Sequence, residues 1–438
     1  MPLVAGLFLL GLGPGCRDGA AGNSHPEEDA EVPTLDASSL PGADASPPGP
    51  ICPSPLPVAA PEGAFLPMSQ PLSGSRPRCA KVTHAFAGAA GSTLEIEVLD
   101  WGGFRPGVLV VRDLLGQKLA SLAPVRPGAK LQLTLERSGE HLLELGPRIV
   151  TAPANSYRLF VRCIDGCDLE YSRYPIVLMH GMAGTDAYLD VVNYYNGVHD
   201  HLTTAGYLVA SPGVDAFGSV AQRAGQWQGH LDDLEAQGLG RRFNFIAHSQ
   251  GGLDARYLIS RLGDDRPASL TMIATPNLGT EVADVVCGII DPDSLAAGLA
   301  DLVVGAVSGF LGLGSGEISA QVLDLTTPAM AAFNAVTLDS PQVAYYSWAG
   351  HSCGALQPIC IAEQQGEVVF VLLGPTYTLL DFLVGPNDGM VPVRSAIWGE
   401  YLGELPADHV NEVGHSMPVF DHLEFYLGEA RRLAFFGM

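Results

Sequence analysis

The alternation of apolar and polar residues divides the chain into two parts with different expected secondary structure. Between residues 78 and 168, apolar side chains recur at every second position in five short segments, which is the pattern of strands with one buried face. These segments are 94–98, 108–111, 131–135, 141–145 and 157–161. Glycine and proline turn signals separate them, so this part predicts a small β-sandwich domain.

From residue 169 to residue 438 the pattern changes to nearly continuous apolar runs that alternate with helical stretches. The runs lie at 176–179, 207–210, 243–247, 270–274 and 343–348. Strands that are apolar at almost every position are buried on both faces, as in a mostly parallel sheet covered by helices. The second part therefore predicts an α/β domain, which makes α/β the fold class of the chain.

Residues 1–77 show neither pattern. An apolar run at residues 2–15 ends at Cys16, and segment 1–16 resembles a bacterial lipoprotein signal, with an ordinary secretory signal as the alternative. Residues 17–77 are rich in acidic residues, Pro, Ala and Ser, and they predict a disordered tether. We therefore expect an exported protein, either a lipoprotein of the outer membrane or cell surface, or a secreted protein.

Charge and cysteine content limit the expected partners and the cellular compartment. The 47 Asp and Glu residues against 23 Lys and Arg give a formal net charge of -24, so a nucleic-acid partner is not expected. Eight cysteines fit an oxidising compartment. Cys353 and Cys360 are close enough in sequence to close a small loop, and Cys287 is the candidate for a free thiol. The other pairings stay open.

One short segment has the pattern of a catalytic nucleophile. The run 243–247 is followed by the letters HSQGG and then by a helical pattern up to residue 262. Small residues two positions before and after the serine let strand and helix approach closely, and the tight turn presents the hydroxyl. We interpret Ser249 as a nucleophile rather than as a structural serine.

A serine nucleophile needs backbone donors for the negative oxygen that forms on its substrate. The letters HGMAGTD follow the run 176–179, and their glycines permit a loop that turns peptide N–H groups toward the serine. We predict the N–H groups of Met182 and Gln250 as these donors. His180, in the same loop, lies far upstream of the serine, and we expect a structural hydrogen-bonding role for it.

In the chain order serine, acid, histidine, both partners follow Ser249. Asp388, in a Gly-flanked turn before an apolar run, is the best acid, although a solvated turn aspartate has the same local sequence. His409 is our candidate base, and His415 and His422 are its rivals. Local sequence prefers His409 only weakly.

Six sequence blocks in the second part occur together and in the order found in one enzyme family. They are YPIVLMHGMAGTDAY, AHSQGGLDARY, TMIATPNLGTEVADVV, LDLTTPAMAAFN, YYSWAG and NDGMV. Over residues 174–435 the chain resembles the true bacterial lipases of the Pseudomonas and Burkholderia type, which have the α/β-hydrolase fold. The resemblance implies Ser249 as nucleophile, Asp388 as acid, His409 as base, and Met182 and Gln250 as oxyanion donors.

The resemblance also places a helical lid at about 283–333. Apolar residues recur there at helical spacing, while aspartates and several glycines exclude a membrane span. Such a lid covers the serine in water and opens at a lipid surface. A plain core helix is the alternative.

The chain departs from that family at two places. Arg394 stands where the family has a cysteine of a structural disulfide. Where the family binds a structural calcium ion, Asn411 replaces an aspartate and His415 stands in place of a glutamine. Because calcium prefers several charged oxygens, we expect no cofactor and no retained metal site, with a rebuilt calcium site as the alternative.

These observations predict a serine carboxylic ester hydrolase, a lipase that cleaves acyl esters such as triacylglycerols through an acyl-serine intermediate. Its expected partners are a lipid or other acyl-ester substrate and a membrane or lipid–water interface, and a lipase-specific chaperone is compatible with the resemblance. The alternatives are an esterase, phospholipase or polyester depolymerase, or a catalytically silent surface binding protein.

Overall fold

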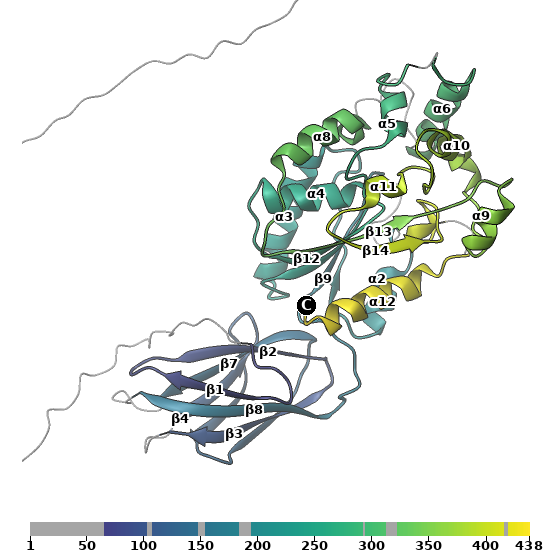
Figure 1. Ribbon diagram of the computed structural model, residues 1–438. Helices are drawn as coiled ribbons and strands as arrows, with labels where there is room; N and C mark the ends of the chain where they lie inside the picture. Colours follow the sequence, from purple (N-terminus) through teal and green to yellow (C-terminus); the bar gives the residue numbers. More distant parts are fainter. Residues whose placement is uncertain are drawn as a thin grey trace, which may run out of the picture. The chain divides into compact units, whose positions relative to one another are not determined.

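The computed structural model describes residues 65–102, 107–147, 154–183, 194–291, 294–311, 322–415 and 419–438 (Figure 1). The expected signal segment 1–16 with Cys16, and the expected tether up to residue 64, lie outside these ranges. Within the described ranges, no helix is long and apolar enough to cross a membrane.

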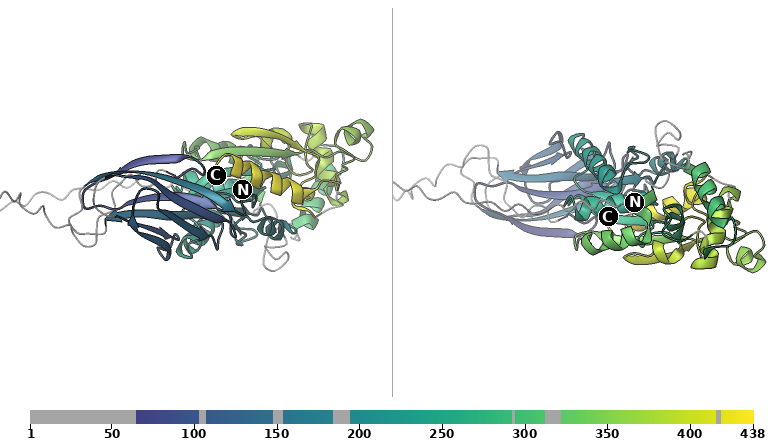
Figure 2. Two further views of the ribbon diagram at one scale, coloured as in Figure 1. Left: turned by 90° about the horizontal axis from the view of Figure 1, so that it is seen from below. Right: turned by 90° about the horizontal axis from the view of Figure 1, so that it is seen from above.

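The first part of the chain forms two antiparallel four-stranded sheets, which are the predicted β-sandwich (Figures 1 and 2). One sheet has the strand order β1-β8-β3-β6 and the other β2-β7-β4-β5. The strands are β1 (Pro71–Arg76), β2 (Val82–Gly88), β3 (Thr93–Trp101), β4 (Gly107–Arg112), β5 (Lys118–Val125), β6 (Lys130–Thr134), β7 (Gly139–Pro147) and β8 (Asn155–Asp165). Apolar side chains from both sheets, among them Phe86, Ile96 and Leu143, are fully buried between them.

The folded part begins earlier than the sequence pattern indicated. Leu66 is fully buried in the core of the sandwich, and β1 lies at residues that we assigned to the tether, so the boundary at residue 78 was placed too late. The pattern missed β1, β2 and β5, and all three are outer strands of their sheets. In β1 and β5, most side chains are at least partly exposed, which weakens the apolar alternation of these outer strands.

The second part contains a six-stranded parallel sheet with the strand order β10-β9-β11-β12-β13-β14. Its strands are β9 (Ile176–Met179), β10 (Val209–Ala210), β11 (Phe243–His248), β12 (Pro267–Ile273), β13 (Ala344–Gly350) and β14 (Glu400–Leu405). The expected strand at 207–210 is shorter than predicted. The pattern missed β14, an outer strand in which only Leu405 is buried.

Helices cover both faces of this sheet (Figure 1). Their bounds are α2 (Val198–Thr204), α3 (Val220–Ala236), α4 (Gln250–Ser260), α5 (Glu281–Val286), α6 (Leu299–Leu311), η2 (Leu323–Leu325), α8 (Thr327–Val336), α9 (Pro358–Glu363), η3 (Val371–Leu373), α10 (Gly374–Leu383), α11 (Val393–Ala396), η4 (Asn411–Val413) and α12 (His422–Phe435).

Successive side chains of the central strands enter two separate cores. Ile176 and Leu178 of β9 pack with the side chains of α2 and α12 on one face. Val177 and Met179 of the same strand pack with α3 and α4 on the other face. This explains the continuous apolar runs in the sequence, because both faces of each central strand are buried.

A third apolar cluster in this part involves α5, α6 and α10, within and after the expected lid segment 283–333. Val303, Val307 and Leu311 of α6 are buried at intervals of four residues, so they share one face of the helix. Asp301 and Leu302 on α6 are exposed. Residues 312–321 of the expected lid lie outside the described part of the chain.

The cysteine expectations that fall on described residues are confirmed. A disulfide joins Cys353 to Cys360, another joins Cys163 to Cys167, and Cys287 keeps its thiol. At Arg394, where the resemblance would place a cysteine, the guanidinium forms an ion pair with Glu281 at the start of α5.

Candidate active site

Ser249 occupies the turn between β11 and α4 in a strained conformation. Its φ of 54° and ψ of -129° lie outside the regions that L-residues favour. Glycines make the turn possible, because a Cβ atom on Gly251 would collide with the carbonyl oxygen of Met179 and one on Gly252 with Thr275. The turn has the geometry of a nucleophile elbow, and it places Ser249 at the carboxyl end of the parallel sheet.

The structure brings Ser249, His409 and Asp388 together. The Oγ atom of Ser249 lies 3.0 Å from Nε2 of His409, and Nδ1 of His409 lies 2.7 Å from Oδ2 of Asp388. The other carboxylate oxygen of Asp388 accepts hydrogen bonds from the main-chain N–H groups of Met390 and Val391. A carboxylate in this place favours the tautomer with the proton on Nδ1, so that Nε2 can accept the serine proton.

The rival histidines lie against other partners. Nε2 of His415 is 2.8 Å from the carbonyl oxygen of Tyr194, and Nε2 of His422 is 2.8 Å from that of Asn196. Each of these rings therefore donates to a main-chain carbonyl in the segment before α2. The geometry selects His409 as the partner of Ser249.

The two predicted oxyanion donors lie beside the serine. The loop after β9 passes so close that a Cβ atom on Gly181 would be 2.8 Å from Cβ of Ser249. Met182, the next residue, lines the same cavity as Ser249. Gln250 is the first residue of α4, where the helix dipole is positive and favours a developing negative charge.

Buried side chains fix the loop after β9 through hydrogen bonds. His180 accepts a hydrogen bond from the N–H of Val214 at Nε2 (3.0 Å), and its Nδ1 lies 2.8 Å from the carbonyl oxygen of Gly181. Burial lowers the pKa of His180 to about 3, so the ring is neutral and donates from Nδ1. Both ring nitrogens are occupied, which is the structural role that we expected for this residue.

Arg223 adds a second anchor. It donates to the carbonyl oxygen of His180 (2.6 Å) and to the carboxylate of Asp254 (2.7 Å), and both charged side chains are fully buried. Burial raises the pKa of Asp254 to about 6, and the adjacent guanidinium opposes that rise.

Arg223→Met should therefore destabilise the protein by about 3–5 kcal/mol, because a buried carboxyl group loses its charged partner. We expect the melting temperature to fall by about 10 °C. The matched control is Arg431→Met, since Arg431 pairs with Glu170 and Glu424 at the surface and its loss should change the melting temperature little. Equal melting temperatures for the two variants would contradict the anchoring role.

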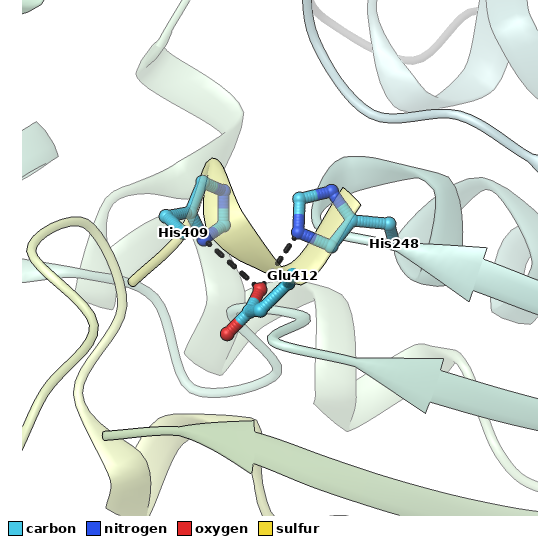
Figure 3. Close-up of side chains that lie close together, drawn as sticks. All are labelled: His248, His409 and Glu412. Atoms are coloured by element: carbon cyan, nitrogen blue, oxygen red, sulfur yellow. Dashed lines mark hydrogen bonds and ion pairs between the residues drawn. The ribbon is translucent and has the colours of Figure 1, made fainter. Parts of the chain in front are cut away.

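A second buried cluster includes His409 (Figure 3). Nε2 of His248 lies 2.8 Å from Oε2 of Glu412, and that same oxygen is 3.8 Å from Nδ1 of His409. Tyr194 Oη is 2.7 Å from Nδ1 of His248. Burial lowers the pKa of His248 and raises the pKa of Glu412 well above its usual range, and nearby Asp388 adds to the latter. Both groups are therefore favoured in their neutral forms.

The donor set of this cluster does not fit a resident metal ion, although its three side chains lie close enough for one. His409 already directs Nδ1 at Asp388, and His248 directs both ring nitrogens at other side chains. A metal ligand must offer a free lone pair, so an ion here would have to break the hydrogen bond of His409 to Asp388.

A segment closed by the Cys353–Cys360 disulfide, which we define as the strap (residues 351–373), supplies another buried acid near the loop of His409. Glu367 of the strap accepts hydrogen bonds from the main-chain N–H of Asp408 (3.1 Å) and from the side-chain amide of Asn411 (3.2 Å). Burial and the nearby Asp408 carboxyl raise the pKa of Glu367 to about 7. Asp408, Asn411 and Glu367 are all almost completely buried.

The serine opens onto an apolar cavity of about 150 Å³. Val307 and Leu311 of α6 form part of its wall, and Val282 and Val286 of α5 form another part. The cavity is lined mainly by aliphatic side chains, with Ser249, His248, His409 and His415 among the polar exceptions. Its chemistry suits an aliphatic chain whose polar end reaches the serine.

Comparison with known proteins identifies relatives of this chain, although no protein-family model matches it. Triacylglycerol lipase 2 of Saccharomyces cerevisiae is 32% identical over 235 residues, which are 51% of this chain and 62% of that protein. The triacylglycerol lipase of Pseudomonas fragi is 29% identical over 292 residues, which are 61% of this chain and 98% of that protein. The chain thus spans less than two thirds of the yeast relative and almost all of the Pseudomonas relative.

Among solved structures, the mature form of the Bacillus licheniformis lipase BlEst2 is 18% identical. The alignment covers 60% of this chain and 92% of the BlEst2 chain, with a TM-score of 0.45.

Proposed function

Because this chain is similar to several curated triacylglycerol lipases, we propose that it is a carboxylic ester hydrolase that cleaves lipid esters through an acyl-serine intermediate. The observation that carries the proposal is the hydrogen-bonded series Asp388, His409 and Ser249 at a nucleophile elbow that opens onto an apolar cavity. A binding protein would have no need of a strained serine in contact with an oriented imidazole.

In the first half of the reaction, Ser249 Oγ attacks the ester carbonyl carbon while Nε2 of His409 takes its proton. The N–H groups of Met182 and Gln250 donate to the negative oxygen of the tetrahedral intermediate. The C–O bond to the alcohol then breaks, and His409 returns the proton to the leaving alcohol. In the second half, water attacks the acyl-serine with His409 again as base, which releases the fatty acid and restores Ser249.

The apolar lining of the cavity supports an aliphatic acyl group as the substrate, and its volume of about 150 Å³ holds only the first few carbons of a long chain until the wall moves. Its wall includes one face of α6, so this helix would act as a lid that moves aside at a lipid–water interface. The chain has no Lys or Arg between Arg266 and Arg394, a range that contains α5, α6, α8, α9 and α10. Acidic residues without basic ones repel anionic head groups, which favours uncharged acylglycerols over anionic phospholipids.

The finer expectations from the sequence remain part of the proposal. Export follows from the lipoprotein-like segment 1–16, and an exported lipase would meet its substrate at a membrane surface or a lipid droplet. A lipase-specific chaperone would act during folding, before the buried site closes.

The decisive test is hydrolysis by the purified full chain of an emulsified long-chain triacylglycerol and of a short soluble ester, in a pH-stat. We expect cleavage of both, with the triacylglycerol rate rising steeply once an emulsion forms. Vesicles of an anionic phospholipid should be cleaved more slowly. Cleavage of the soluble ester alone would leave an esterase without lipid specificity, and cleavage of neither would favour the silent binding protein.

A further inference from the structure

The residues beside the catalytic histidine do not fit the calcium ion that the resemblance to lipases implies. Calcium takes about six to eight oxygen ligands. Asp408 has little ligand capacity left, because Oδ1 accepts the N–H groups of Val410 and Asn411 and is saturated, and Oδ2 accepts that of Phe370 and keeps one lone pair. Both oxygens of Glu367 also accept N–H groups. Five N–H donors thus already satisfy these two carboxyl groups, and the lone pairs that are left are too few for the six to eight oxygen ligands of calcium.

Asn411 is a further residue that does not fit a calcium ion. It directs the donor end of its amide at Oε2 of Glu367, at 3.2 Å, in the position where the lipases have an acidic ligand. Two carboxylates at this distance would repel each other without a cation between them. A carboxylate and an amide attract each other and need no ion.

The contacts of the strap reach both catalytic loops. Glu367 holds the main-chain N–H of Asp408, the residue directly before His409. At its other end, the N–H of Ser352 donates to the carbonyl oxygen of Asn387, the residue directly before Asp388, at 3.0 Å. The Cys353–Cys360 disulfide closes the strap between these two contacts. The base and the acid are thus held by one segment.

We propose that Glu367 is a positioning residue, which holds the loop of His409 against the acid turn through the Asp408 N–H and the Asn411 amide, in place of a metal ion. This inference rests on the proposed ester hydrolysis, and it adds the reason why that chemistry needs no calcium in this chain. Glu367 touches no reacting atom and acts through the loop.

Exchange of the acid at position 367 and the amide at position 411 tests the proposal. Asn411→Asp sets a carboxylate against Glu367, so we expect kcat for a short soluble ester to fall about tenfold with little change in KM, because the base is misplaced while the cavity is intact. Glu367→Gln combined with Asn411→Asp restores a donor opposite an acceptor. The double variant should recover kcat to within about threefold of the parent, which a merely additive effect would not do.

The matched control is Gln357→Glu. Gln357 also lies in the strap and donates to a carboxylate, that of Asp381, at 3.0 Å, but this contact is exposed and far from His409 in the chain. The same amide-to-acid change should therefore leave kcat unchanged. If Gln357→Glu lowers kcat as much as Asn411→Asp, the effect is general and Glu367 has no special role.

Metal dependence and stability complete the test. A chelator should change neither kcat nor the melting temperature of the parent chain. If the chelator lowers both quantities and added calcium restores them, Glu367 is a calcium ligand and the proposal is overturned. The melting temperatures of the four proteins should follow the same order as kcat. This second readout tests the pairing of residues 367 and 411 even if no ester is cleaved, so its failure is distinct from a failure of the proposed function.

Discussion

Ser249→Ala should lower kcat for ester hydrolysis by about a thousandfold or more while the chain stays folded. The reason is chemical: without Oγ no acyl-serine bond forms, and the oxyanion donors and the cavity alone give only weak catalysis. Ser249 is almost fully buried and its backbone conformation is set by the turn, so the smaller side chain fits without strain on its neighbours. Initial rates on a short soluble ester measure the effect.

Ser260→Ala, at the far end of the same helix α4, is the matched control and should keep full activity. A fluorophosphonate probe gives an independent readout, since it labels an activated serine whatever the natural substrate. The parent and the control should be labelled and Ser249→Ala should not. A folded Ser249→Ala chain that retains a tenth of the parent rate would show that another residue is the nucleophile.

His409→Ala should reduce kcat by a similar factor, because Ser249 then lacks a base at 3.0 Å. The matched control is His415→Ala, since His415 also lines the cavity but contacts the Tyr194 carbonyl oxygen instead of the serine. We expect His415→Ala to change KM more than kcat. If His415→Ala is the inactive variant and His409→Ala is active, the base has been assigned to the wrong histidine.

The residues that the sequence predicted best are those with a strong local signal. The elbow at Ser249 combines a buried strand, small neighbours and a helix, and each is visible in a window of about twenty residues. Asp388 and His409 have weaker local signals and gained theirs from the collinear blocks of the lipases. The structure then separates His409 from His415 and His422 by distance alone.

The site residues that the sequence analysis missed contact residues that are distant in sequence. Glu412 and His248 are hydrogen-bonded at a sequence separation of 164 residues, and Glu367 and Asn411 at a separation of 44. Neither acid lies in a pattern that distinguishes it from a solvated surface residue, because burial depends on the tertiary fold. A hint was present at Asn411, where a neutral residue replaces an acid and so requires a new partner.

The missed strands have a related physical cause. β1, β5 and β14 are outer strands, and most of their side chains are at least partly exposed. β2 has a buried apolar face, but His84 interrupts it, since this histidine is buried through a 2.7 Å hydrogen bond to Tyr157. Periodicity detects burial of apolar surface and does not detect polar residues that are buried in pairs.

The main-chain N–H of His409 donates to the carbonyl oxygen of Asp388 at 2.9 Å, so backbone atoms as well as side chains join the two catalytic loops. Removal of the serine hydroxyl leaves this connection untouched. The inactive chain should therefore still recognise an intact ester but never release it as products. The Ser249→Ala protein can be incubated with a total lipid extract and recovered on an affinity resin. Mass spectrometry of the bound lipids would then identify the physiological substrate.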